Sequence, residues 1–226
     1  MESFESQFYP FEKVYTGFNT FSGAEKIPLK ILTFLLDLPD GNGYEPTDRN
    51  DRARVRLAKY LWYDGGNPLS NALPTPQQKL SMLFDGNEPV LNADELKEKH
   101  PQGYRLFPQE YWGQAQLTAK TVLKCYLGKI IPANETKAVI GLDFEVWCNV
   151  NHQNTTKTAA YERAYNIEQC VVEALNGVDI GGVGCVRFSR AMHYECGSRP
   201  IRDEGTNVGR AFTLALEWQE DTHNKI

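Results

Sequence analysis

The sequence of 226 residues lacks a long apolar run, a large charge excess and a close pair of cysteines. Its longest apolar run, ILTFLL at residues 31–36, is far too short to span a membrane. The start, MESFESQFYPFEKVY, has acidic residues where a signal peptide would carry basic ones. We therefore expect a soluble protein that has no membrane partner and is not secreted by a standard signal.

Net charge and cysteine content further limit the partners and the compartment that we expect. The chain has 24 Lys and Arg against 29 Asp and Glu, and the net charge of -5 gives no overall field that attracts nucleic acid or anionic lipid. The cysteines are odd in number, widely spaced and without a CxxC pair, which is typical of free thiols in a reducing compartment. They are Cys125, Cys148, Cys170, Cys185 and Cys196. We therefore expect assembly in a cytoplasm.

The chain has enough apolar residues to form a hydrophobic core. The chain is 41% hydrophobic and 12% aromatic, and no repeat, low-complexity segment or obvious linker divides it. We expect a single α+β domain over residues 1–226, with an extended aromatic arm at 1–23, a helical region at 24–100 and a strand-strand-helix-strand-strand core at 101–226. The expected core is an antiparallel or mixed sheet packed on one long helix.

Four helices are expected in the first half. They fall in AEKIPLKILTFLLDLPDG, TDRNDRARVRLAKYLWYDGG, LPTPQQKLSMLFDGN and NADELKEKH. Thr47 or Asp48 can cap the second helix, because their side-chain oxygens accept from free backbone N–H groups. Thr75 can cap the third, with Pro76 at the first helical position, and Leu80 would belong to its apolar face.

Strands dominate the second half. Alternating or apolar segments predict strands in YRLFP, TVLKCYLGKII, KAVIGLDFEVWCNVN, VGCVRFSRAMHYEC and GRAFTLALEWQE. Between them, TTKTAAYERAYNIEQCVVEALNG predicts a long helix that ends at Gly177. The polar segment 197–210 is expected to be a charged loop between the last two strands.

A glycine cluster follows this long helix. Gly177, Gly181, Gly182 and Gly184 in ALNGVDIGGVGCVRF superficially resemble a phosphate-binding loop. Such loops lead from a strand into a helix, whose N-terminal N–H groups face the anion, and here the order is reversed. We therefore interpret the glycines as a helix C-cap and a turn into a strand, with no bound phosphate.

Two constellations could carry chemistry. Cys148, His152, His193 and Cys196 could form a zinc site or a small hydrolase centre if two strand ends met. A small buried cysteine beside a surface histidine needs no metal, and we favour that interpretation. Asp143 and Glu145 stand on one side of a strand, where a solvated face is favoured over a catalytic carboxylate pair.

The second expected helix is basic. Arg52, Arg56 and Lys59 fall on one helical face and could contact phosphates, although Asp48 and Asp51 partly offset them. We favour a solvated or subunit-contacting face over a specific nucleic-acid site. We assign no catalytic, cofactor-binding or metal-binding residue and expect neither a cofactor nor an enzyme.

The order of elements from about residue 138 to 220 resembles the tail-terminator and tail-completion proteins of tailed bacteriophages. The resemblance lies in AVIGLDFEVWCNV, YERAYNIEQCVVEALNG, the glycine turn and the final FTLALEW. The whole chain, including LWYDGGNPLSNALPTPQQKLSMLFDGNEP, is similar to neck or tail proteins of the crAss-like phages.

This resemblance implies a structural virion protein without an active site. It would form a homo-oligomeric ring of twelve or six copies in the neck or tail, as a connector, adaptor or tail terminator. Its neighbours would be portal, neck and tail proteins, and genomic DNA would pass non-specifically through the lumen. The aromatic arm, the 197–210 loop and the glycine corner would be subunit contacts. The alternatives are a small Cys/His metal-dependent enzyme and a nucleic-acid-binding accessory protein.

Overall fold

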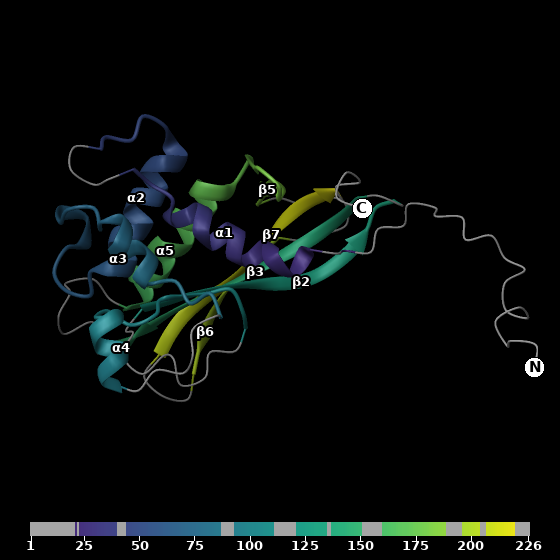
Figure 1. Cartoon of the computed structure of the whole chain (residues 1–226). Coiled ribbons are helices and arrows are strands. Elements are labelled where there is room, and N and C mark those ends of the chain that lie inside the picture. The colour runs from purple at the N-terminus through teal and green to yellow at the C-terminus, as the bar shows by residue number, and fades with distance from the viewer. Residues whose placement is uncertain are drawn as a thin grey trace, which may run out of the picture.

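The computed structural model describes residues 21, 23–39, 44–86, 93–110, 121–134, 137–150, 160–188, 196–203 and 207–219. In these residues a mixed β-sheet carries α1 and α5 over one face, and its long strands extend beyond the helices at one end (Figure 1). The expected aromatic arm at 1–23 lies outside the described residues, apart from positions 21 and 23.

The helices lie close to where the sequence predicts them. They are α1 (Ile27–Leu36), α2 (Arg49–Trp62), α3 (Pro76–Ser81), α4 (Ala93–Lys99) and α5 (Ala160–Leu175), with short 3-10 turns at Ala24–Lys26 and Pro68–Ser70. The side chain of Asp48 caps α2 by accepting from the backbone N–H of Asp51. Thr75 and Gln78 form a capping box at the start of α3. The prediction for Leu80 is wrong, because its side chain is 62% exposed.

Among the described residues, seven strands form the sheet. They are β1 (Leu106–Phe107), β2 (Thr121–Pro132), β3 (Lys137–Asn149), β4 (Val178–Ile180), β5 (Gly184–Arg187), β6 (Ser198–Arg202) and β7 (Asn207–Gln219). Their order is β1-β2-β3-β7-β5-β4, and β6 also pairs with β7. β1 and β2 are parallel and the other pairs are antiparallel, so the α+β class with a mixed sheet is confirmed.

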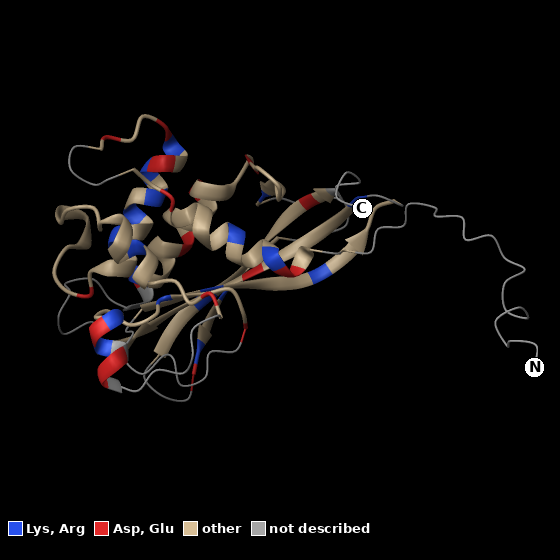
Figure 2. Ribbon diagram, viewed as in Figure 1, with Lys and Arg blue, Asp and Glu red and all other residues tan. Residues whose placement is uncertain are grey.

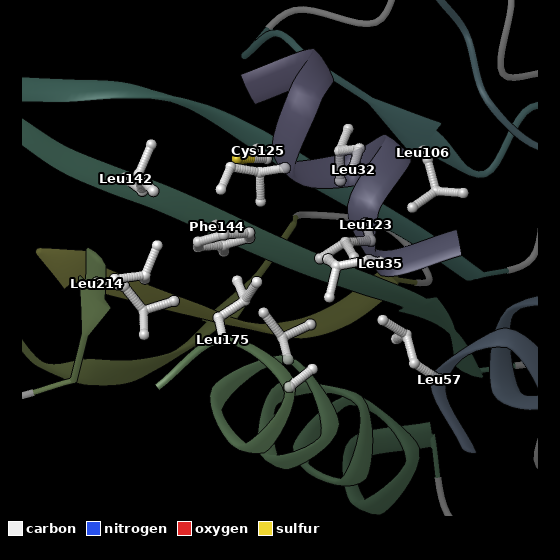
Figure 3. Close-up of a cluster of buried hydrophobic side chains, with 14 of the residues drawn as sticks. Leu32, Leu35, Leu57, Leu106, Leu123, Cys125, Leu142, Phe144, Leu175 and Leu214 are labelled. Atoms are coloured by element: carbon white, nitrogen blue, oxygen red, sulfur yellow. The ribbon is translucent and has the colours of Figure 1, made fainter. Parts of the chain in front are cut away.

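The core lies between the sheet and the helices. Alternate residues of β3 and β7, such as Phe144 and Phe212, point to this side, where their rings stack with centroids 5.1 Å apart. Figure 3 shows leucines of α1 and α5 directed at the same strands. The sheet is therefore covered by α1 and α5 together, with α2 packed against α5, and not by one long helix as expected.

Two strands were not expected. The supposed 197–210 loop contains β6 and the first residues of β7, and β4 precedes the glycine turn. Gly177 ends α5 with φ 79°, as predicted, and Gly182 with φ 70° lies in the turn between β4 and β5. The glycine corner is thus a helix cap followed by a small hairpin.

Buried arginines join the helices to the rest of the fold. Arg54 of α2 donates to the carbonyl of Phe34 at 2.7 Å and pairs with Asp51, which ties α2 to the end of α1. Arg163 of α5 donates to the Tyr63 carbonyl at 2.6 Å, beyond the last residue of α2. Carbonyls at a helix end lack intrahelical donors, so a buried guanidinium satisfies them.

The sheet edges are poor templates for further strands. β2 pairs with β1 only at Leu123 and Lys124, and a bulge interrupts β2 between Leu127 and Ile130. β6 carries Pro200, which has no N–H to offer, and β4 is only three residues long. Bulges, proline and short strands are devices that limit edge-to-edge pairing.

Candidate functional site

Polar side chains gather on the sheet face opposite α1 and α5. The strand register places Lys124 of β2 opposite Glu145 of β3, and Tyr126 opposite Asp143. On the other side of β3, Thr213 of β7 lies opposite Asp143. Because alternate residues of a strand share a face, these five side chains lie together on the second face of the sheet.

Glu145 is the centre of this cluster. Its carboxylate accepts from Trp147 Nε1 at 2.8 Å, from Lys124 Nζ at 3.1 Å and from the Tyr126 hydroxyl at 3.0 Å. Burial alone would raise the pKa of Glu145, but the hydrogen bonds from Trp147 and Lys124 and the Lys124 charge outweigh it, so the pKa is lowered. Glu145 is therefore ionised near neutral pH.

Asp143 is held from two sides. The Thr213 hydroxyl donates to its Oδ1 at 2.5 Å. Its Oδ2 lies against Gly128, where a Cβ would overlap the carboxylate. Gly128 sits within the β2 bulge, between Leu127 and Ile130, so the bulge makes room for the acid. The position of Asp143 thus depends on three strands.

A groove of about 380 Å³ lies beside these carboxylates. Tyr126, Asp143 and Glu145 line it on one side, and Ser198 and Arg199 of β6 line it on the other. Arg199 is exposed, and its side chain makes no hydrogen bond or ion pair within the described part of the chain. The groove therefore presents negative charge on one wall and a free positive charge on the opposite wall.

Two titratable side chains of the groove, Glu145 and Tyr126, have pKa values shifted away from neutral pH. Burial and the neighbouring Glu145 charge raise the pKa of Tyr126, so its phenol stays protonated near neutral pH. A general acid or base works best when its pKa is near the working pH, and Glu145 and Tyr126 are shifted away from it. Fixed charges of this kind suit ionic recognition of a polar partner surface.

Comparison with known proteins places the chain in a family. Residues 55–199, more than half of the chain, match a family model described as YomW. The chain belongs to the YomW family. The name is that of an SPbeta-like prophage gene, which suggests a phage protein.

The other comparisons add little. No curated protein matches the chain. One solved structure, whose title names no function, matches at 13% identity over 57% of this chain and 89% of its own, with a TM-score of 0.28. A TM-score this low supports no argument about fold or function. The YomW match includes both acids of the groove and Arg199, but ends before Thr213.

The Cys/His quartet also lies within the YomW match. Cys148 is fully buried on the helix side of β3, and this burial raises the pKa of its thiol to about 12. Cys196 is half-buried, and its Sγ lies 3.5 Å from the Arg187 carbonyl oxygen. His152 and His193 lie outside the described residues, and within those residues no group of His, Cys, Asp or Glu could hold a metal. A buried thiol with a raised pKa is a poor nucleophile and a poor metal ligand.

The basic residues of α2 divide into two groups. Arg54 is buried and internal to the fold, and Lys59 donates to the Leu69 carbonyl at 3.2 Å. Arg49, Arg52 and Arg56 lie on the outer side, where Glu173 of α5 pairs with Arg49 and Arg56.

Within the described part of the chain, no helix is long and apolar enough to cross a membrane.

The sequence predicted only part of the groove. The alternation in DFEVW placed Asp143 and Glu145 on one face, and the structure confirms this. The same alternation puts Lys124 and Tyr126 on one face of β2, but it does not show which residues of β3 they oppose. Arg199 was missed as a groove residue because the segment around it was expected to be a loop.

Proposed function

We propose that this chain is a structural protein of a phage virion, which assembles with copies of itself into a ring in the neck or tail. The ring would act as a connector, adaptor or tail terminator, most like those of crAss-like phages. Its partners would be further copies, adjacent portal, neck and tail proteins, and genomic DNA that passes through the lumen. Membership of a family that carries the name of a prophage gene supports the phage part of this proposal.

The groove with charges of both signs is the observation that carries assembly. Arg199 lines the groove without a counter-ion in the described residues, and Asp143 and Glu145 also line it. A neighbouring copy that brought an acid to Arg199 and a base to Asp143 would complete both. Head-to-tail contacts of this kind between identical subunits form a ring when the rotation from one subunit to the next closes.

The sheet edges support contact through this face. The bulge in β2, Pro200 in β6 and the short β4 all disfavour association by strand addition. Subunits would therefore meet through side chains of the groove and through segments laid on a neighbour. Ionic contacts between preorganised groups favour specific orientation over high affinity, as an ordered ring requires.

Charge reversal at Arg199 tests the groove. In Arg199→Glu the groove would be acidic on both walls, so we expect the oligomer to dissociate or to require higher salt, measured by light scattering after size exclusion. Arg202→Glu is the matched control. Arg202 lies on the same strand, but its side chain is on the face of the sheet opposite to the groove, because its register partner is Val208. Equal oligomer mass in both variants would contradict a subunit contact at the groove.

A further inference from the structure

We infer that the outer face of α2 is a binding surface for the phosphodiester backbone of DNA. Arg49, Arg52 and Arg56 follow one another at spacings of three and four residues, so they form one stripe along the helix. With Pro46, Val55 and Glu173 they line a hollow of about 440 Å³. Figure 2 shows basic residues along α2, in a chain whose net charge is -5.

The stripe is positive after its internal ion pairs are counted. Glu173 lies 3.4 Å from Arg49 and also pairs with Arg56. Three arginines and one glutamate leave a formal charge of +2 at the hollow. Arg52, between the two paired arginines, is exposed and has no side-chain partner in the described part of the chain.

The guanidinium of Arg56 is partly open to solvent. Its side chain is 41% exposed although it pairs with Glu173. Guanidinium groups suit phosphate oxygens because their planar N–H donors can bind two oxygens at once.

The dimensions of the stripe suit a phosphate backbone. From Arg49 to Arg56 the helix rises by about 10 Å, because each residue adds about 1.5 Å. A DNA strand carries one phosphate for about every 3.4 Å of helix axis, so the stripe can meet two or three phosphates in succession. An acidic protein segment would offer less regular spacing of negative charge.

In the proposed ring, this stripe would be the face that contacts the DNA in the lumen. The inference rests on the proposed function only in taking the DNA to be the phage genome. Two or three phosphate contacts give weak, salt-sensitive and sequence-independent binding, which suits DNA that must move past the protein. Glu173 would set the strength of the contact, because it neutralises part of the stripe.

The test uses the full-length protein and a fluorescently labelled random-sequence DNA duplex. We expect Arg52→Ala to weaken binding severalfold at low salt and to reduce the slope of log affinity against log salt by about 1. Glu173→Gln should tighten binding severalfold. Arg202→Ala removes the same charge from β6 and should leave binding unchanged, and circular dichroism would show that all variants are folded.

The outcomes separate the possibilities. Equal DNA affinity of Arg52→Ala and Arg202→Ala, or no binding by the wild type at low salt, would overturn the inference. Binding of poly-glutamate but not of DNA, lost in Arg52→Ala, would also overturn it and assign the stripe to an acidic protein partner. A monomeric protein whose DNA binding depends on Arg52 would uphold the stripe while the ring proposal failed.

Discussion

At the scale of single residues, Glu145 shows how the groove keeps its charge. Trp147, Lys124 and Tyr126 donate to a half-buried carboxylate, and these bonds lower its pKa from the ordinary value of 4.5. A group with a lowered pKa in the folded state stabilises the fold above its unfolded pKa. This contribution is lost as the pH falls from about 4.5 through the folded pKa.

Glu145→Gln should therefore destabilise the protein in a pH-dependent way. We expect a loss of roughly 1–3 kcal/mol at pH 7, because hydrogen bonds to a charged acceptor are replaced by neutral ones. The difference from wild type should shrink as the pH falls below about 4.5. Urea unfolding at both pH values measures it. Glu217→Gln is the control, since its ion pair with Arg187 is exposed and should contribute little. A difference for Glu145→Gln that does not change with pH would contradict this account.

Gly209 is required by close packing between strands. Gly209 lies on β7, opposite Trp147 of β3. A Cβ at this position would overlap the backbone carbonyl of Val146. Gly209→Ala should cost at least about 1–3 kcal/mol, because the backbone cannot yield as a flexible side chain could. Gly197→Ala, where a Cβ meets nothing within 4 Å, should be close to neutral in the same thermal unfolding measurement. Similar stability of the two variants would contradict the register between β3 and β7.

At the scale of elements, Arg163 holds α5 against the rest of the fold. Its side chain reaches Thr121 at the start of β2 and the carbonyls of Tyr60 and Tyr63 at the end of α2. Burial lowers the pKa of this guanidinium, and the carbonyls compensate its charge with hydrogen bonds. One side chain thus connects two helices and a strand.

Replacing this side chain should loosen all three elements. In Arg163→Met the two carbonyls lose their donor, and we expect a loss of at least about 2 kcal/mol in the free energy of unfolding. Glu162→Ala is the neighbouring control, since Glu162 is exposed, and it should change stability by no more than about 0.5 kcal/mol. Hydrogen exchange should also show faster opening of α5 in Arg163→Met. Unchanged exchange in α5 would show that Arg163 does not anchor the helix.

Elements with a long periodic pattern could be predicted from the sequence. The repeat of α5 and the alternation of β3 each extend over more than ten residues, so local sequence determines them. β4 and β6 could not be predicted, because VDI and SRPIR are short and become strands only by pairing with β5 and β7. The groove could not be predicted for the same reason, because its residues come from different strands that meet only in the folded protein.

At the scale of the whole molecule, we propose separate tasks for the two charged surfaces. The groove beside β6 would hold a neighbouring copy, and the stripe on α2 would meet DNA. They lie on opposite sides of the sheet, since α2 packs on α5, which covers the face away from the groove. A subunit arranged in this way could contact its neighbours and DNA at the same time.

The native mass of the purified full-length protein tests the central proposal most directly. One chain has a mass of 25.6 kDa. Self-assembly into a ring predicts a discrete multiple of this mass by native mass spectrometry, formed in a concentration-dependent way and reduced in Arg199→Glu. A single species of 25.6 kDa at every concentration, alone and with the portal and neck proteins of the same phage, would contradict it.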